Sequence, residues 1–126
     1  MAYRVSKAEF EGLVERALAE LPARFAEFLE EVPVEIMDKP DARQVRQYQF
    51  SDPKRIMGLY DGVPLTERSV EHSGVRPPVI YIFRETIERF ATSEADLIQQ
   101  VRTTVLHEIG HHFGMSEDDL DELGYG

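Results

Sequence analysis

Residues 93–114, SEADLIQQVRTTVLHEIGHHFG, carry the strongest helical pattern in this chain of 126 residues. Ser93 suits a helix N-cap with acidic residues in the first turn, and Gly114 suits the position that ends a helix. Apolar side chains recur at spacings of three and four, as on the buried face of a helix: Ile98, Val101, Val105, Ile109 and Phe113. We therefore predict a long, half-buried helix over this stretch.

The opposite face of this predicted helix is polar and contains His107 and His111. Residues four apart in a helix lie on one side, one turn apart, so the two imidazoles can bind a single zinc ion. Glu108 completes an HExxH pattern, in which a carboxylate next to the metal serves as general base toward a water molecule. The alternative is a pair of surface histidines on an ordinary amphipathic helix.

A third metal ligand is expected shortly after the two histidines. Gly114 extends the pattern to HExxHxxG, and a glycine at this point allows the chain to fold back through positive φ. Glu117 then follows at a position suited to complete the ligand set. Asp118, Asp121 or a water molecule are the alternatives, because Glu117 also fits as a first-turn acid of a short helix beginning at Ser116.

Two segments resemble a known family. HEIGHHFGMSEDDL, residues 107–120, resembles the signature of the small bacterial zincin-like metallopeptidases, and RPPVIYIFRETIERF, residues 76–90, resembles the segment before their metal-binding helix. The resemblance covers essentially the whole chain. It implies a zinc site with His107 and His111 as ligands and Glu108 as general base. The family motif is often written HExxHxxGxxD, whereas this chain has Glu117 at the last position and Asp118 beside it, which leaves the third ligand open.

The remaining sequence predicts an α+β fold. An N-terminal helix should begin at Ser6, which has capping-box spacing with Glu9, and a second helical stretch should cover residues 23–32. Strands are expected at 32–36 and 79–83, and Asp61-Gly62 gives a hairpin-like signal within residues 56–65. A loop or short irregular element is expected at 41–52 and a loop at 66–78, with short helices at 85–92 and from 116 onward. Together with the resemblance, this predicts a small zincin-like fold, in which a short mixed sheet packs on the N-terminal helix and the C-terminal metal-binding helix.

Further side chains are candidates for the site or for its surroundings. Tyr81 and Arg84 are candidate contacts for a substrate or for the oxyanion formed on it. The strand at 79–83 fits either a sheet edge, where an extended peptide can add by backbone hydrogen bonds, or a central core strand. His112 points about 100° away from His111 and is expected to pack or to support a ligand. His72 lies in a polar loop and is expected to be solvated rather than to line the cleft.

The composition argues against several classes of function. Acidic residues outnumber basic residues by 24 to 14, and the resulting formal net charge of −10 disfavours nucleic acid and anionic membrane surfaces as partners. The chain has no cysteine, so disulfides and thiolate metal sites are ruled out. The N-terminal segment lacks the apolar region of a signal peptide, and no apolar run is long enough to span a bilayer. We expect a cytoplasmic protein with a single domain over residues 1–126, in an oligomeric state that the sequence does not indicate.

The leading functional hypothesis is a zinc metallopeptidase that binds one zinc ion per chain and hydrolyses peptides or proteins, with Glu108 as base. The second hypothesis is a zinc-binding module that interacts with peptides or proteins and has little or no proteolytic activity. The third is a helix-rich interaction protein in which HExxH is accidental. A fourth protein ligand on the zinc would favour the second hypothesis, whereas an open position would favour the first.

Overall fold

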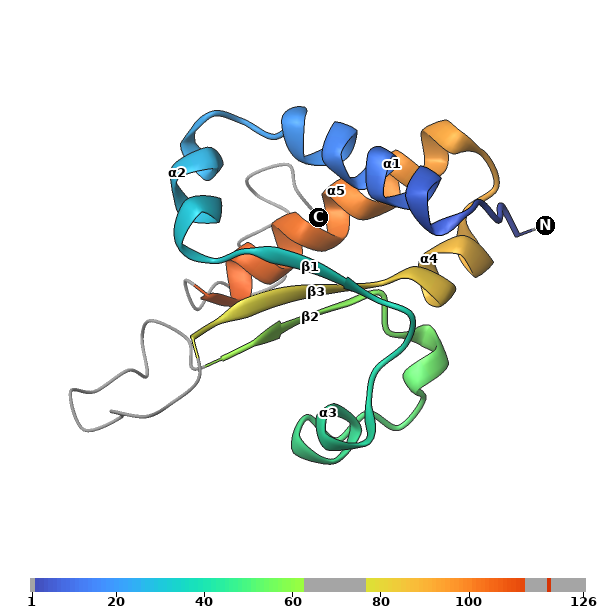
Figure 1. Ribbon diagram of the computed structural model, residues 1–126. Helices are drawn as coiled ribbons and strands as arrows, with labels where there is room; N and C mark the ends of the chain where they lie inside the picture. Colours follow the sequence, from blue (N-terminus) through green and yellow to red (C-terminus); the bar gives the residue numbers. More distant parts are fainter. Residues whose placement is uncertain (1, 63–76, 113–117, 119–126) are drawn as a thin grey trace.

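The computed structural model describes residues 2–62, 77–112 and 118, and shows an α+β fold (Figure 1). The order of elements is α1 (Lys7–Ala19), α2 (Arg24–Glu31), β1 (Val34–Met37), α3 (Ala42–Gln47), the 3-10 turn η1 (Pro53–Arg55), β2 (Gly58–Asp61), β3 (Val79–Phe83), α4 (Arg84–Phe90) and α5 (Glu94–His112). The expected class is confirmed: a short mixed sheet packs against an N-terminal and a C-terminal helix.

The three strands of the sheet lie in the order β1-β3-β2. β1 runs parallel to β3, and β2 runs antiparallel to it. β3 is therefore the central strand, so of the two alternatives for residues 79–83 the core strand is correct and the edge strand is wrong. Its uninterrupted apolar sequence, VIYIF, is typical of a strand with neighbours on both sides.

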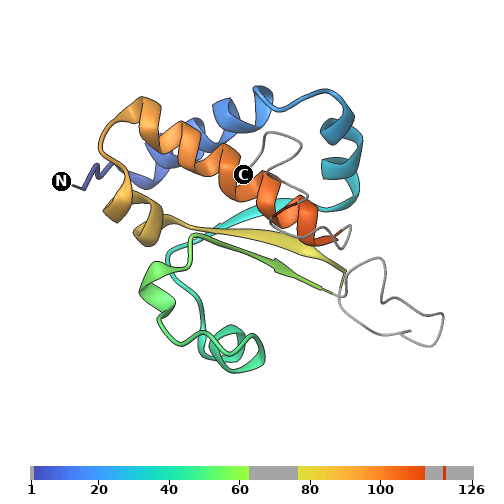
Figure 2. The ribbon, with the colours of Figure 1, turned by 180° about the vertical axis from the view of Figure 1, so that it is seen from behind.

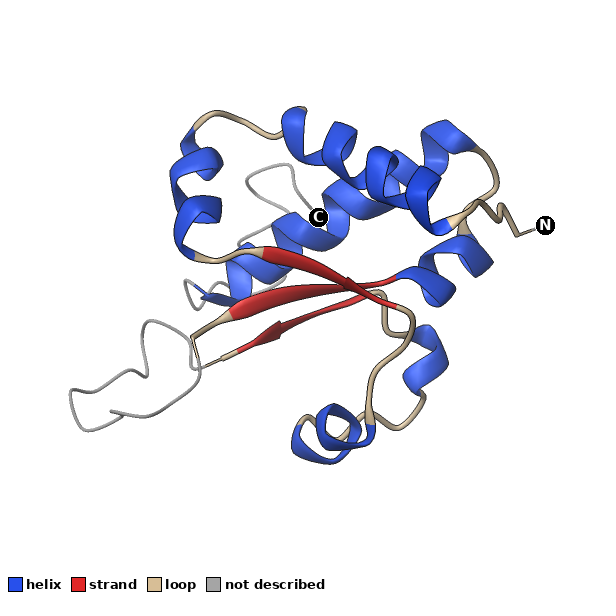
Figure 3. Cartoon of the chain, viewed as in Figure 1, coloured by secondary structure: helices blue, strands red, loops and turns tan. Residues whose placement is uncertain are grey.

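Helices cover the sheet unequally on its two faces. α1 and α5 lie together on one face, with α2 at the end of that layer, whereas α3 lies on the opposite side (Figure 1); the view from behind shows the same arrangement (Figure 2). Colouring by secondary structure shows the three strands between these two groups (Figure 3). The core lies between the sheet and the α1–α5 layer, and includes Phe10, Val14, Ala17, Ile80, Ile82, Val101, Val105 and Ile109.

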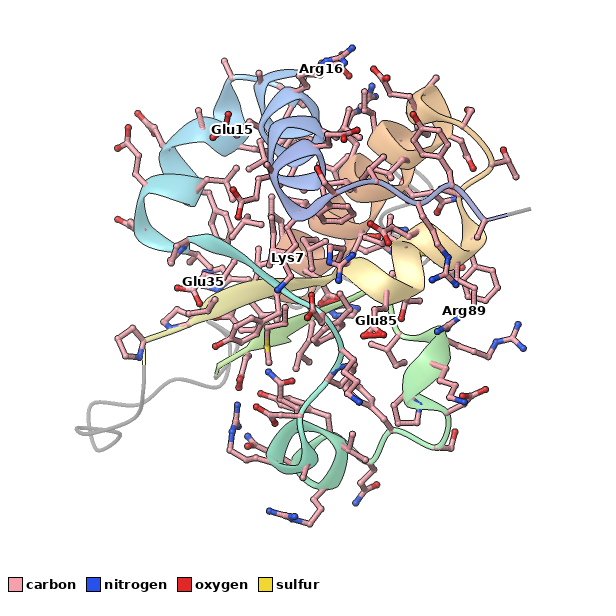
Figure 4. All side chains as sticks on the ribbon, turned by 45° about the vertical axis from the view of Figure 1, so that its right-hand side comes forward. Lys7, Glu15, Arg16, Glu35, Glu85 and Arg89 are labelled. Carbon is pink, nitrogen blue, oxygen red and sulfur yellow. The ribbon has the colours of Figure 1, made fainter. Side chains whose placement is uncertain are left out.

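Both long helices begin at the predicted N-caps. The Glu9 amide donates to Ser6 Oγ at 3.1 Å at the start of α1, and the Asp96 amide donates to Ser93 Oγ at 3.1 Å at the start of α5. Glu15 and Arg16 lie on the outer side of α1 (Figure 4), and Arg16 forms an ion pair of 2.6 Å with Glu94 on α5. The two helices are thus joined by apolar contacts inside and by a charged contact at the surface.

Two local predictions were wrong. Residues 41–52, expected as a loop, contain α3, which begins with a capping box: the Gln44 amide donates to Asp41 Oδ1 at 2.8 Å, and the Asp41 amide donates to Gln44 Oε1 at 3.0 Å. Asp61-Gly62 does not form a two-residue hairpin, because the antiparallel partner of β2 begins only at Val79. The predicted loop at 66–78 and the helix from residue 116 fall almost wholly outside the described residues.

A long side chain of α4 bonds to η1. Arg89 of α4 donates to the carbonyl oxygen of Lys54 at 2.6 Å, and Figure 4 shows Arg89 beside the η1 turn. This contact fixes the segment that leads into β2. In the described part of the chain, every helix is either too short or too polar to cross a lipid bilayer.

Candidate metal centre

α5 orients the two histidines away from the core, as its sequence predicts. Val101, Val105 and Ile109 are fully or almost fully buried against the sheet and α1. His107 is half-buried, and the side chain of His111 is 49% exposed. Because the helix repeats every 3.6 residues, the two imidazoles lie one turn apart on the side opposite the apolar stripe.

Glu108 is buried at the junction of α5 and β2. Its Oε2 accepts a hydrogen bond of 3.0 Å from the backbone amide of Tyr60 and lies 3.1 Å from Nδ1 of His111. A buried carboxylate is costly unless it is hydrogen-bonded, and both contacts reduce that cost. The Glu108 carboxylate is therefore held in place between a strand and an imidazole.

The outer edge of β2 faces this site. The Phe83 amide donates to the Met57 carbonyl at 2.8 Å, so Met57 and Phe83 form a hydrogen-bonded pair. In an antiparallel pair of strands, hydrogen-bonded and non-hydrogen-bonded residue pairs alternate. Leu59 therefore also directs its backbone amide and carbonyl to β3. Gly58 and Tyr60 then direct theirs outward, in agreement with the hydrogen bond from Tyr60 to Glu108. Within residues 2–62 and 77–112, no further strand pairs with this edge.

His112 lies on the core side of the helix, as expected for a packing or supporting histidine. Its Nδ1 is 2.6 Å from the hydroxyl of Tyr60, and its ring packs edge-on against Phe28 and Tyr60 at centroid distances of 4.7 and 5.2 Å. Tyr60 is therefore held by its side chain while its amide binds Glu108. Sequence reasoning did not select Tyr60, because 48 positions separate it from Glu108.

Two cavities meet at Glu108. The larger, of about 660 Å³, is lined by Tyr48, Phe50, Ile56, Leu59, Glu108 and His111 among others. The smaller, of about 490 Å³, includes Arg55, Gln100, Thr103, His107 and Glu108 in its lining. Glu108 thus lines both cavities, whereas His111 lines the larger one and His107 the smaller one.

The side chains at the site fit a metal that prefers nitrogen and oxygen ligands. Two imidazoles one helical turn apart suit zinc, and a chain without cysteine has only imidazole, oxygen and thioether donors to offer. Among the described residues, no group of three or more His, Asp or Glu side chains converges to hold a metal. Glu117 and Asp121 lie outside those residues, and Asp118 is exposed.

A family relationship agrees with this arrangement. The family model described as zincin-like metallopeptidase matches residues 29–126, most of the chain. The chain belongs to this family. No curated protein matches it. The match begins inside α2, so α1 lies outside the matched region, although Phe10, Val14 and Ala17 of α1 belong to the core that supports α5.

Tyr81 and Arg84 do not lie at the candidate site around Glu108. Ile80 and Ile82 face the core, so the intervening Tyr81 points to the opposite face of the sheet. Arg84 donates to Asp38 at 3.0 Å and to buried Glu88 at 3.1 Å. The hydrogen bond from Arg84 to Asp38 lowers the pKa of the Asp38 carboxyl. Neither side chain lines the two cavities at Glu108. His72 lies outside the described residues.

A buried carboxylate joins α3 to the end of β2. Asp61 accepts a hydrogen bond of 2.8 Å from the Tyr48 hydroxyl and forms a close ion pair with Arg43. Burial, followed by the hydrogen bond to Asp61, raises the pKa of Tyr48 to about 12. Tyr48 therefore keeps its proton at neutral pH and forms a fixed, uncharged wall of the larger cavity.

The raised pKa of Tyr48 predicts a pH dependence of stability. A folded-state pKa of about 12 against an ordinary value of 10.0 means that folding favours the neutral phenol. The stabilisation is complete below about pH 10 and is lost as the pH rises through about 12. Urea unfolding across that window should show a steeper loss for the natural chain than for Tyr48→Phe. Identical pH profiles for the two proteins would contradict the assignment.

Gly58 allows β2 to approach α5 closely enough for Tyr60 to reach Glu108. A Cβ at Gly58 would lie 2.4 Å from Cγ2 of Thr104 and 3.0 Å from the carbonyl oxygen of Tyr81. We expect Gly58→Ala to lower the free energy of unfolding by about 1–3 kcal/mol, as overpacking typically does. Urea denaturation followed by circular dichroism measures the change.

Gly12 provides the control for this substitution. It lies within α1, and a Cβ there would meet nothing within 4 Å. Gly12→Ala should therefore stabilise the protein by about 0.5–1 kcal/mol, because alanine is the better helix former. A Gly58→Ala variant as stable as Gly12→Ala would show that the strand and helix are not in close contact.

Proposed function

We propose that this chain is a zinc-dependent peptidase in which His107, His111 and Glu117 bind one zinc ion and Glu108 is the general base. Family membership and the HExxH spacing on α5 support the proposal. The observation that carries it is the position of Glu108: a buried carboxylate between two histidines, at the point where two cavities meet. A zinc site with a purely structural role needs no carboxylate of this kind.

The chemistry is divided between the metal and the chain. Zinc, when bound, supplies Lewis-acid chemistry that polarises the scissile carbonyl and acidifies a water molecule. Glu108 removes a proton from the attacking water and then donates it to the departing amine, so the carboxylate ends as it began. The Tyr60 amide keeps Oε2 oriented through this cycle, and His112 fixes Tyr60.

The outer edge of β2 supports a peptide as the substrate. An extended peptide that adds to this edge would bind by backbone hydrogen bonds to the outward amide and carbonyl of Gly58 and to the carbonyl of Tyr60, while the Tyr60 amide stays bound to Glu108. These groups lie beside Glu108, as the hydrogen bond from Tyr60 indicates. A peptide bond in such a strand is brought next to the proposed base.

A zinc-binding interaction module without hydrolytic activity is the second candidate. The hydrogen bond from the Tyr60 amide to Oε2 favours it, because that contact alone gives Glu108 a structural role. In such a module, a further protein ligand would close the coordination shell of the metal.

Incubation of the zinc-loaded protein with a degenerate peptide library, followed by mass spectrometry, separates the two candidates. The peptidase should produce new peptide termini that do not form after chelation and that return when zinc is restored. Tight peptide binding without any cleavage would favour the interaction module instead.

A further inference from the structure

The larger cavity at Glu108 is mainly apolar on the side away from the helix. Tyr48 and Phe50 stack there, with ring centroids 6.1 Å apart and planes inclined by 23°. Ile56 and Leu59 continue the apolar lining. Its volume of about 660 Å³ lies in the range of pockets that enclose small ligands, and it can accommodate a large side chain.

The wall of this cavity is fixed before any ligand binds. The Tyr48 hydroxyl is held by Asp61, which is itself paired with Arg43, and α3 is anchored by its capping box. A preorganised wall loses little conformational entropy when a ligand binds.

The charges around the cavity favour an uncharged occupant. None of the described residues that line it is Lys, Arg or Asp, and Glu108 is the only acid among them. Glu108 and the proposed zinc ligand His111 lie at the helix side of the cavity. In the part formed by Tyr48 and Phe50, a charged side chain would meet no opposite charge among the described lining residues, so its burial there would be costly. The smaller cavity differs, because Arg55 contributes to its lining.

We propose that the larger cavity binds an apolar side chain, aromatic or branched aliphatic, of the substrate residue next to the scissile bond. Glu108 and His111 line the same cavity, so a side chain placed in it belongs to a residue beside the proposed base. Tyr48 and Phe50 are then the residues that determine specificity. This inference rests on the proposed peptidase function, and it is tested by binding rather than by cleavage.

The test uses the zinc-loaded Glu108→Gln variant, so that peptides are not consumed. Fluorescein-labelled peptides of one Ala/Ser sequence carry a single variable residue: Phe, Leu, Ala, Asp or Lys. Fluorescence anisotropy should show Phe and Leu peptides binding at least about tenfold more tightly than the Ala peptide, as one or more methylenes buried in an apolar pocket imply. The Asp and Lys peptides should bind no better than the Ala peptide.

Phe50→Asp, added to this variant, should reduce the ratio of Kd values for the Ala and Phe peptides to near 1. Gln49→Asp is the matched control, because it adds the same charge at the adjacent, exposed residue, whose φ of 56° aspartate tolerates well. It should preserve the ratio. If Phe50→Asp fails to fold, Phe50→Ala, which removes the same ring without adding a charge, should also lower the ratio.

Equal binding of Phe and Ala peptides, or a ratio unchanged by either Phe50 variant, would overturn the pocket assignment. Cleavage of peptides by the natural chain would still support the peptidase function in that case. Apolar selectivity in binding without any cleavage would instead retain the pocket and remove the proposed activity.

Discussion

Glu108→Gln should lower kcat/KM by about 10²–10⁴-fold, the range that a general base contributes, while one zinc ion remains bound. Glutamine has nearly the same shape, and its carbonyl oxygen can still accept the hydrogen bond from the Tyr60 amide. The amide cannot take up the proton of the attacking water, so the effect should appear in kcat. The loss of activity is measured by cleavage of a peptide identified in the library, and the retention of zinc is measured by calorimetry.

Glu94→Gln is the control for this experiment. Glu94 lies on the same helix, at its exposed N-terminal end, where it pairs only with Arg16 at the surface among the contacts described. Surface ion pairs contribute little to stability, so activity should change less than about twofold. Turnover by Glu108→Gln close to that of Glu94→Gln would exclude Glu108 as the base.

His107→Ala and His111→Ala should each weaken zinc binding by more than 100-fold. Residues that only orient a metal ligand typically contribute about 10–100-fold, and loss of a ligand should exceed that. His111 is exposed and His107 is half-buried, and neither belongs to the hydrophobic core, so the fold should survive their removal. Calorimetric titration of the chelator-stripped variants measures the affinity, and circular dichroism measures the fold.

A variant of the adjacent His112 distinguishes the loss of a metal ligand from the loss of a packing residue. His112→Ala removes the partner of the Tyr60 hydroxyl from a buried site and should lower the free energy of unfolding by about 1–3 kcal/mol. Its zinc affinity should stay within about tenfold of that of the natural chain. The reverse pattern, with zinc lost in His112→Ala and kept in His107→Ala, would refute the assigned ligands.

The elements predicted correctly from sequence are those with a strong local pattern. The apolar stripe of α5 spans several turns, and the five apolar residues of β3 form one run, so both could be recognised without tertiary information. α3 has only six residues, too few for a helical period to be visible, although its Asp41–Gln44 capping spacing was present in the sequence. The prediction of a hairpin at Asp61-Gly62 was wrong because the strand that pairs with β2 is β3, which begins much later in the sequence, at Val79.

The candidate site likewise combines features that the local sequence predicts with features that it does not. The placement of His107, Glu108 and His111 on one helix follows from their spacing, and the structure places them as expected. The hydrogen bond from Tyr60 and the wall formed by Tyr48 depend on pairing between distant segments, which no local pattern encodes. Tyr81 and Arg84 were expected at the site, but strand alternation and the contacts with Asp38 and Glu88 place them elsewhere.

Anomalous diffraction from crystals of the zinc-loaded protein, recorded at the zinc absorption edge, tests the central claim most directly. We predict one zinc ion per chain, bound by His107, His111 and Glu117, with the fourth position open to solvent beside Glu108. Zinc enclosed by four protein ligands, or bound at residues other than His107 and His111, would contradict the proposed peptidase site.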